Sequence, residues 1–224
     1  MGEKKNLNKA PDTAKERLLH AAVKLFAEQT YGETTTRQIA MEAGSSISML
    51  NLHFGSKENL YRKALERVID VFALQNFSLF GEIIEARDQG NMNKDFIWNF
   101  IERMTLLLVD ITHDPEYKNE VLLLNRELQN WEHGFRYVEP ILLFYYNYAL
   151  LFEAYTGAPE GSLWAKQLSF STITGVFRNA CYPALRDHLL GDIPRTSLQE
   201  TVEEAGKYHL HAIKSVLCDH LIKE

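Results

Sequence analysis

The chain has 224 residues, of which 46% are hydrophobic and 24% are charged, and its net charge is −6. This length and composition suit a globular protein with one large core or two smaller ones. The acidic balance excludes a protein that coats nucleic acid indiscriminately. No apolar run reaches the roughly 18 residues of a membrane span, and the N-terminus lacks the apolar segment of a secretion signal. We therefore expect a cytoplasmic protein with no membrane partner.

The first twelve residues, MGEKKNLNKAPD, are polar and carry three lysines, which predicts a mobile arm. These lysines either touch DNA phosphates or belong to a solvated tail, and the sequence leaves both interpretations open. Thr13 and Glu16 have the spacing of a capping box, which predicts a helix from there to about Gln29. The apolar residues of this helix recur at helical spacing: Leu18, Ala21, Ala22, Leu25 and Phe26.

A second capping box, from Thr35 and Gln38, opens a short helix that runs to about Ala43. Gly44 suits the left-handed residue that ends a helix, and Ser46 is the expected N-cap of the next one. That helix has one apolar face, which we expect to be buried: Ile47, Leu50 and Phe54. Its opposite face presents mostly short or hydrogen-bonding side chains: Ser48, Met49, Asn51, Leu52 and His53. Such a face suits the reading of base edges in the major groove of DNA.

The segment GETTTRQIAMEAGSSISMLNLHFGSKENLY, at residues 32–61, resembles the TetR family of bacterial transcriptional regulators. The likeness rests on the paired threonines, the IA and AG pairs, the short helix ending in HF and the following SKENLY. The wording LNLHFGSKENLY also resembles the CecR-like members of the family. Two positions depart from the family's pattern: Ser45 stands where a buried Val is usual, and Leu52 where an aromatic or polar residue helps to contact the DNA backbone.

The resemblance implies a protein that binds double-stranded operator DNA through eight residues: Thr35, Arg37, Ser46, Ser48, Met49, Asn51, His53 and Lys57. The charge distribution permits this role, because residues 1–60 carry eight Lys or Arg against seven Asp or Glu, while the remainder carries sixteen against twenty-three. Binding would then depend on a local polar and basic face, doubled by dimerisation. The alternative is a helical hairpin with no role in DNA binding.

After Phe54 the sequence predicts further helices and no strand. Ser56 caps a long helix starting at Lys57, whose apolar stripe is Leu60, Ala64, Leu65, Val68, Val71 and Phe72. A polar loop at 86–93 follows. Later helices are expected at 94–113, 114–130, 135–155 and 162–190, and a third capping box, Ser197 with Glu200, opens the last one, to about Leu221. The fold class is all-α, with a three-helix helix-turn-helix domain at 1–56 and a larger helical ligand-binding and dimerisation domain at 57–224.

The stretch between Phe96 and Tyr155 is dense in aromatic residues. Aromatic side chains around a few convergent polar groups form apolar ligand pockets, although core packing explains any one of them. The family's habit of binding small effectors favours a pocket for an apolar or aromatic effector. The candidate ligand-binding residues are Phe100, Met104, Asn125, Arg126, Gln129, Tyr145, Asn147, Tyr148, Phe152 and Arg178. The resemblance implies that an effector shifts the helix beginning at Lys57 and releases a repressor from its operator.

The last two predicted helices mix small and apolar residues. The resemblance implies that they form a four-helix bundle with the same helices of a second chain. Such a homodimer would present two recognition helices to a near-palindromic operator. The candidate dimer residues are Ile173, Val176, Phe177, Ala180, Leu210, Ile213 and Leu217. The alternative is that both apolar stripes belong to the core of a single chain.

The sequence carries no GxSxG, HExxH or phosphate-binding loop, so we expect no catalytic residue, cofactor or metal site. Cys181 and Cys218 are expected to be buried packing residues, with a thiol switch as the alternative. The interpretation is a bacterial DNA-binding transcriptional regulator, a repressor released by a small molecule. The competing interpretation is a ligand-binding or protein-interaction dimer that keeps the scaffold without binding an operator.

Overall fold

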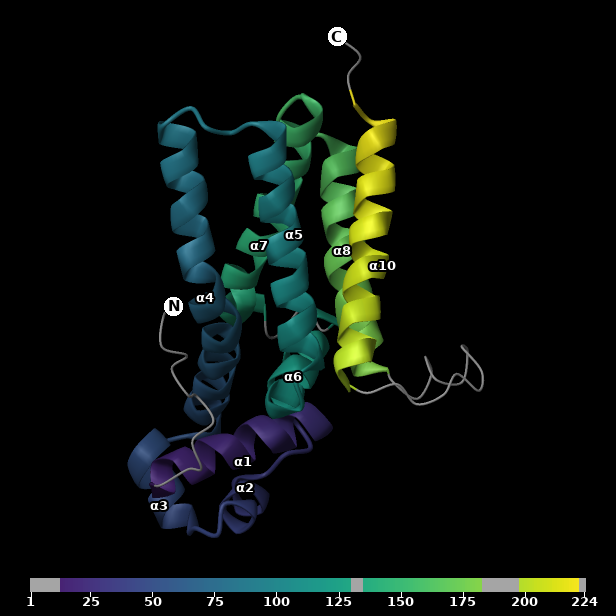
Figure 1. Cartoon of the computed structure of the whole chain (residues 1–224). Coiled ribbons are helices and arrows are strands. Elements are labelled where there is room, and N and C mark those ends of the chain that lie inside the picture. Colours follow the sequence, from purple (N-terminus) through teal and green to yellow (C-terminus); the bar gives the residue numbers. More distant parts are fainter. Residues whose placement is uncertain (1–12, 130–134, 183–197, 222–224) are drawn as a thin grey trace, which may run out of the picture. The chain divides into compact units, whose positions relative to one another are not determined.

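The computed structural model describes residues 13–129, 135–182 and 198–221, and within these ranges it contains helices and no strand (Figure 1). The N-terminal helices are α1 (Ala14–Glu28), α2 (Thr36–Glu42), α3 (Ile47–Phe54) and α4 (Lys57–Asp88). They are followed by α5 (Lys94–His113), a 3-10 turn η1 (Pro115–Tyr117), α6 (Lys118–Gln129), α7 (Phe135–Thr156), α8 (Leu163–Cys181) and α10 (Leu198–Asp219). The prediction of an all-α chain is confirmed.

The helices pack into two compact units. The first, which we call the N-terminal unit, contains residues Met1–Phe72 and Pro115–Glu139. The second, the C-terminal unit, contains Ala73–Asp114 and Pro140–Glu224. The grouping therefore divides α4 and α7 between the units and adds α6 to the N-terminal helices. The expectation of separate domains at 1–56 and 57–224 stays a prediction.

Local capping defines the starts of the first helices as the sequence predicts. Thr13 and Glu16 form a complete capping box at α1, and Thr35 and Gln38 form another at α2. The Ser46 hydroxyl accepts a hydrogen bond from the backbone N–H of Met49 at the start of α3. Each of these bonds satisfies an N–H group that has no partner inside its helix.

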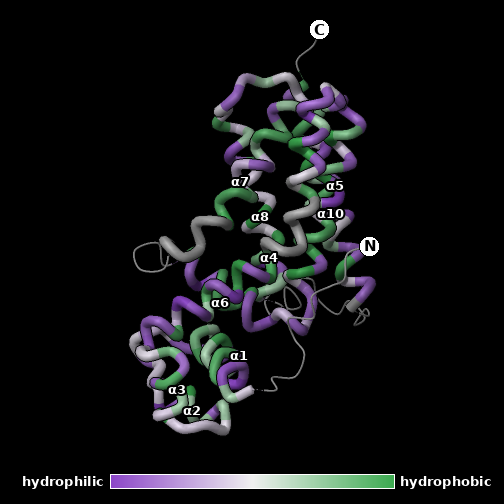
Figure 2. The backbone as a smooth tube through the Cα atoms, turned by 90° about the vertical axis from the view of Figure 1, so that its left-hand side faces the viewer, coloured by the Kyte–Doolittle hydropathy of each residue, from purple (hydrophilic) through white to green (hydrophobic). Residues whose placement is uncertain are grey.

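Two apolar stripes build the core of the N-terminal unit. All five predicted core residues of α1 are buried, and α1 packs against α2, α3 and α6. The predicted stripe of α4 is no more than 1% exposed at any of its positions: Leu60, Ala64, Leu65, Val68, Val71 and Phe72. Figure 2 shows apolar and polar stretches alternating along the helices, as expected for elements with one buried face.

The prediction that Ile47 is buried is wrong, because this side chain is 43% exposed. Leu50 and Phe54, on the same face of α3, are 0% and 3% exposed. The helical spacing of apolar residues identifies which face of a helix is buried. It does not show how far along that face the neighbouring helices extend. Ile47 is the first residue of α3, and its side chain projects at the end of the buried stripe.

Several helix ends differ from their predicted positions. Helix α4 continues to Asp88, three residues into the predicted loop, and Gly90 takes a left-handed conformation with φ 70° shortly after it. Pro115 begins a 3-10 turn rather than an α-helix. Helix α8 ends at Cys181 with Tyr182 as its C-cap. The predicted continuation to Leu190 and the capping residue Ser197 lie outside the described residues.

In the C-terminal unit, α5, α8 and α10 pack against one another. Two glycines allow this close approach. A Cβ atom added at Gly206 of α10 would lie 2.7 Å from Cδ2 of Leu106 in α5, and one added at Gly175 of α8 would lie 3.2 Å from Cε1 of His209 in α10. The small residues of α8 therefore accommodate a helix of the same chain.

This packing covers most of the predicted dimer residues within the single chain. Five of the seven are 0–3% exposed within the single chain: Ile173, Val176, Phe177, Ile213 and Leu217. They are core residues of one protomer, because their surfaces are already covered by neighbouring elements of that protomer. Ala180 and Leu210 are half-buried. A dimer formed by α8 and α10 has to use other side chains of these helices.

The cysteines differ from each other in environment. Cys181 is half-buried, and burial raises the pKa of its thiol to about 11. Cys218 is exposed, so the expectation of burial is wrong for this residue. Among the described helices, none has the combination of length and hydropathy needed to cross a membrane.

His209 of α10 provides a test of packing in the C-terminal unit. Its side chain is 5% exposed and lies 3.3 Å from the amide nitrogen of Asn179. Burial, followed by the nearby charge of His113, lowers the pKa of His209 to about 4. Because an unfolded histidine titrates near 6.5, the unfolded state binds the proton more tightly between these values, and stability falls as pH falls through this window.

We expect the free energy of unfolding to fall from pH 7 to pH 5, with a contribution from His209 of at most about 1.4 kcal/mol per pH unit. Urea unfolding at both pH values would measure the difference. His209→Gln should flatten this pH dependence, whatever its effect on stability at pH 7. An unchanged pH dependence in the variant would contradict the assignment.

Candidate DNA-binding surface

Helix α1 fixes the position of α2 through polar contacts at its surface. The Arg17 guanidinium donates to the carbonyl of Ala43, the C-cap of α2, over 3.3 Å. Lys24 forms an ion pair with Glu42 in the last turn of α2. These contacts supplement the burial of Ile39 and Ala40, which are 0% and 3% exposed. Helix α2 is therefore held in position both by its buried residues and by polar contacts at the edge of the core.

The turn between α2 and α3 depends on Gly44, whose φ of 56° is a left-handed conformation that other residues adopt at a cost. Helix α3 then begins after Ser46 and is attached through only two buried side chains, Leu50 and Phe54. The rest of this short helix faces away from the core. Two helices joined by a tight glycine turn, with the second helix largely exposed, form a helix-turn-helix unit.

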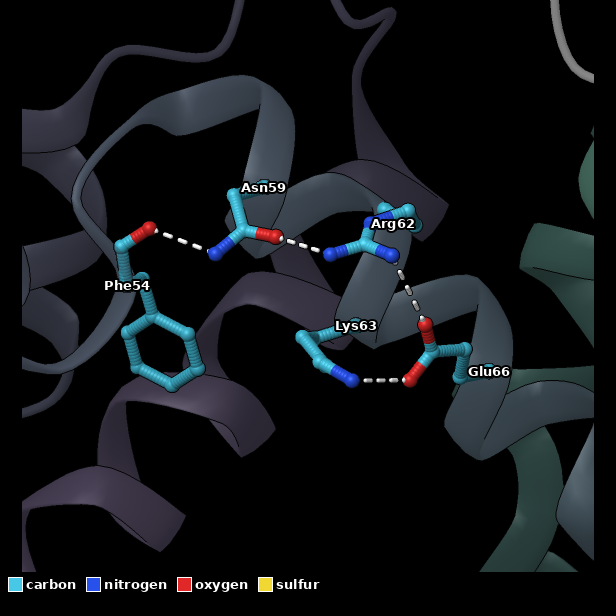
Figure 3. A network of polar contacts seen from close by, with 5 residues as sticks. All are labelled: Phe54, Asn59, Arg62, Lys63 and Glu66. Carbon is cyan, nitrogen blue, oxygen red and sulfur yellow. Dashed lines mark hydrogen bonds and ion pairs between the residues drawn. The ribbon is translucent and has the colours of Figure 1, made fainter.

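A polar network joins the end of α3 to α4 (Figure 3). The Asn59 amide donates to the carbonyl of Phe54 over 2.7 Å, and the Asn59 backbone N–H donates to the Ser56 hydroxyl over 3.1 Å. The carbonyl oxygen of the Asn59 side chain accepts from Arg62 over 2.6 Å. Arg62 and Lys63 both pair with Glu66. Asn59 was missed from the sequence, where it is one of several polar residues in the first turns of α4.

None of the eight predicted DNA-contact residues is buried. Five are exposed, and three are half-buried. The exposed ones are Thr35, Arg37, Ser46, Ser48 and Asn51, and the half-buried ones are Met49, His53 and Lys57. They come from the start of α2, from α3 and from the first residue of α4, so the structure gathers them within one unit.

Two of these residues already use their hydroxyl groups within the protein. The Thr35 hydroxyl donates to the Gln38 side chain over 2.7 Å and accepts from the Gln38 backbone over 3.2 Å. The Ser46 hydroxyl accepts from Met49. Their first role is therefore capping, and a phosphate would compete with Gln38 for the Thr35 proton. Arg37 and Asn51 have no such cap to maintain.

Apolar side chains also project from this surface. Leu52 on α3 is 74% exposed, Met41 on α2 is 77% exposed, and Ile47 is 43% exposed. Large apolar side chains in such positions carry a cost in water. In a DNA groove they can contact the C5-methyl group of thymine. The exposed face of α3 is thus less polar than the sequence pattern alone suggests.

Lys57 is the only cationic residue in the first turn of α4. Its ammonium lies 4.1 Å from the centre of the Tyr31 ring. Burial lowers the pKa of Lys57 from its ordinary value. Tyr31 lies in the α1–α2 connection and was also missed from the sequence, because no local pattern relates positions 31 and 57.

Helix α6 is joined to this unit by polar contacts. The Arg126 guanidinium donates to the carbonyl of Phe26 over 3.0 Å. The Tyr61 hydroxyl donates to the Glu127 carboxylate, and Arg67 pairs with the buried Glu120 at 2.9 Å. Burial and the hydrogen bond to Glu127 raise the pKa of Tyr61 far above its ordinary value. Arg126, a predicted ligand-binding residue, therefore has a structural role at the end of α1.

The predicted ligand-binding residues are divided between the two units. Asn125, Arg126 and Gln129 belong to the N-terminal unit, and the others belong to the C-terminal unit. Four of those others are 0–2% exposed: Phe100, Met104, Tyr148 and Phe152. Tyr145 and Asn147 are half-buried, whereas Arg178 is exposed. The ligand-binding role of this set stays a prediction.

A polar pair lies among the buried aromatics of the C-terminal unit. The hydroxyl groups of Tyr148 and Thr105 are 3.1 Å apart, and Thr105 also donates to the carbonyl of Ile101 over 2.8 Å. Burial raises the pKa of Tyr148, and it raises that of Tyr145 to about 12. Both phenols are therefore neutral at physiological pH. Within the described ranges there is no group of three or more His, Cys, Asp or Glu side chains that could hold a metal ion.

Asn59 provides a test of how α3 is held. Asn59→Ala removes the hydrogen bond to the Phe54 carbonyl, so we expect the free energy of unfolding to fall by about 1 kcal/mol. Arg62→Ala, at the exposed end of the same network, should cost less than about 0.5 kcal/mol. Chemical denaturation of both variants would measure these changes. Equal losses would show that the Asn59–Phe54 bond has no special importance.

Comparison with known proteins agrees with this geometry. Residues 18–64 match the family described as bacterial regulatory proteins, tetR family. The chain is 40% identical over 65 residues to the HTH-type transcriptional dual regulator CecR of Shigella flexneri, a match covering 29% of this chain and 28% of CecR. It is 27% identical over 106 residues to the HTH-type transcriptional repressor NicS of Pseudomonas putida, covering 46% of this chain and 50% of NicS. The sequence matches thus span no more than about half the length of these relatives.

Solved structures extend the likeness in fold to almost the whole chain. A TetR-like regulator from Rhodococcus sp. RHA1 is similar over 92% of this chain and 96% of its own, with a TM-score of 0.63 and 18% identity. The ketosteroid regulator KstR2 of Mycobacterium tuberculosis is similar over 95% and 97%, with a TM-score of 0.60 and 18% identity. The family match lies on α1–α4, and for the remaining helices the likeness is one of fold alone. Residues 18–64 thus match the tetR family of bacterial regulatory proteins, and almost the whole chain shares the fold of the solved TetR-like structures.

Proposed function

We propose that this protein is a sequence-specific DNA-binding transcriptional regulator, a repressor that a small-molecule effector releases from its operator. The observation that carries the proposal is the exposure of α3. Leu50 and Phe54 hold the helix to the core, and all of the predicted contact residues around it reach solvent. The family match at residues 18–64 and the regulator names of the relatives support it.

The contacts follow from the chemistry of each side chain. Asn51 is exposed on α3, and an Asn amide can pair with both N6 and N7 of adenine. Arg37 and Lys57 supply positive charge for phosphates, which position a protein on the duplex without reading its sequence. Because the chain as a whole is acidic, affinity depends on this local surface and on having two copies of it.

The second copy comes from a homodimer, and the helices offered for its interface are α8 and α10. Since their predicted interface residues are mostly core, the contact uses apolar side chains that the single chain leaves exposed. These are Leu163, Phe170 and Tyr208, which are 80%, 55% and 67% exposed. A two-fold axis between such faces places two α3 helices on the half-sites of a palindromic operator.

The effector we propose is an apolar or aromatic small molecule bound in the C-terminal unit. The buried Phe100, Met104 and Phe152 supply apolar surface, and the Tyr148–Thr105 pair supplies a hydrogen-bonding group. Release from DNA requires that the effector bind the non-binding conformation more tightly, since only differential affinity shifts the equilibrium. The competing proposal is a ligand-binding or protein-interaction dimer in the cytoplasm that does not bind an operator.

Selection of fragments of the source genome on the purified protein tests DNA binding directly. We expect a palindromic site that survives moderate salt, with affinity lost in the double variant Arg37→Ala with Asn51→Ala. Arg87→Ala, which removes a positive charge that is 70% exposed at the far end of α4, serves as the matched control and should bind normally. Recovery of no specific site by ligand-stripped protein would favour the competing proposal.

Ile47 and Leu52 lead to a separate prediction about the operator. If these side chains contact thymine methyl groups, replacing single thymines of the selected site by uracil should weaken binding about fourfold per lost contact. The corresponding alanine variant, Ile47→Ala or Leu52→Ala, should no longer distinguish thymine from uracil at its own position. Fluorescence anisotropy would measure the affinities. Insensitivity of wild-type protein at every thymine would exclude these contacts.

A further inference from the structure

Tyr31 has a defined position although it lies in a connection between helices. Its ring centre is 6.0 Å from that of Phe26 in α1 and 4.9 Å from that of Tyr61 in α4. Phe26 is 1% exposed, and Tyr61 is half-buried. Tyr31 itself is 41% exposed. One part of the ring is therefore packed against two helices, while another part remains accessible.

The neighbours of Tyr31 are themselves anchored. Phe26 and Tyr61 contact each other edge-on, with ring centres 4.8 Å apart. The carbonyl of Phe26 accepts from Arg126, and the hydroxyl of Tyr61 donates to Glu127. Both residues against which Tyr31 packs are thus bonded to consecutive residues of α6. The Tyr31 ring thus packs against residues of α1 and α4 that are themselves bonded to α6.

Lys57 lies on this ring. Its ammonium is 4.1 Å from the ring centre, within the range of a cation–π attraction. A cation in the first turn of a helix is disfavoured by the helix dipole, and a lysine stem has four rotatable bonds whose freedom is lost on ordering. Lys57 is half-buried, so part of the residue remains accessible to solvent. The Tyr31 ring offsets the unfavourable interaction of the ammonium with the helix dipole. It also reduces the entropy that the Lys57 side chain loses when a phosphate orders it.

We propose that Tyr31 is a positioning residue for DNA binding. Its ring holds the Lys57 ammonium in place in the free protein, so that Lys57 meets a phosphate without first being ordered. The inference rests on the proposed DNA-binding function. Tyr31 itself need not touch the DNA, and its effect on affinity passes through Lys57.

The contact can be measured without DNA. Protons of the Lys57 side chain that lie over an aromatic ring experience a ring-current shift to high field. In the full-length protein we expect this shift in the wild type and in Tyr31→Phe, and we expect its loss in Tyr31→Leu. Absence of the shift in the wild type would overturn the proposal before any DNA is added.

The effect on binding is measured on the operator selected from the genome, over a series of salt concentrations. Lys57→Met should reduce the magnitude of the slope of log affinity against log salt by about 2, as expected for one phosphate contact in each of the two protomers. Tyr31→Leu should weaken binding about three- to tenfold, and Tyr31→Phe should bind like the wild type. In the double variant, Tyr31→Leu should add little to the loss caused by Lys57→Met.

Three outcomes would overturn the proposal. Tyr31→Leu could weaken Lys57→Met as much as it weakens the wild type, which would show that Tyr31 acts independently of Lys57. Tyr31→Leu could leave affinity unchanged while Lys57→Met reduces it. The ring-current shift could be present in a protein that selects no operator; the proposed function would then fail, and the positioning role would fail with it. Thermal unfolding of each variant separates a loss of fold from a loss of the Lys57 contact.

Discussion

The packing of α1 against α2, α3 and α6 is the constraint on which the candidate DNA-binding surface depends. Seven residues of α1 are buried, and burial of an aliphatic or aromatic side chain contributes about 1.5–3 kcal/mol. Because one short helix provides this surface for three others, α2 and α3 cannot change position independently of α1. Helix α3, which has only two buried side chains, is thereby held in place by α1, which has seven.

Polar contacts add to the apolar packing that positions the helices of the N-terminal unit. Arg17 and Lys24 hold the end of α2, Asn59 holds the end of α3, and Arg126 and Glu127 hold the partners of Tyr31. Except for Glu127, which is buried, these groups lie at the edge of the core, where a charged or amide group can bond inside the protein and remain partly hydrated. These contacts hold the helices of the candidate DNA-binding surface in position, while its outward side chains stay exposed.

The sequence predicted the features that depend on near neighbours along the chain. The capping boxes at Thr13 and Thr35 reach only three residues, and the stripe of α4 follows from helical spacing alone. The features that the sequence did not predict depend on information that the spacing of residues along the chain does not contain. Ile47 was assigned to the correct face but lies beyond the covered part of it, and the stripes of α8 and α10 do not tell whether their partner is the same chain. Contacts such as Tyr31–Lys57 join positions with no shared pattern.

The hydrogen bond between Arg126 and the carbonyl of Phe26 spans 100 positions of the sequence, and it bears on how such proteins can diversify. A recombination event that moved only the first 72 residues into another protein would separate α1 from the α6 that covers it. The acquired segment would meet an unmatched surface at Phe26, Tyr61 and Arg67. Exchange of recognition helices between regulators of this kind is therefore expected to carry α6 with it, or to be followed by compensating substitutions at positions 120, 126 and 127.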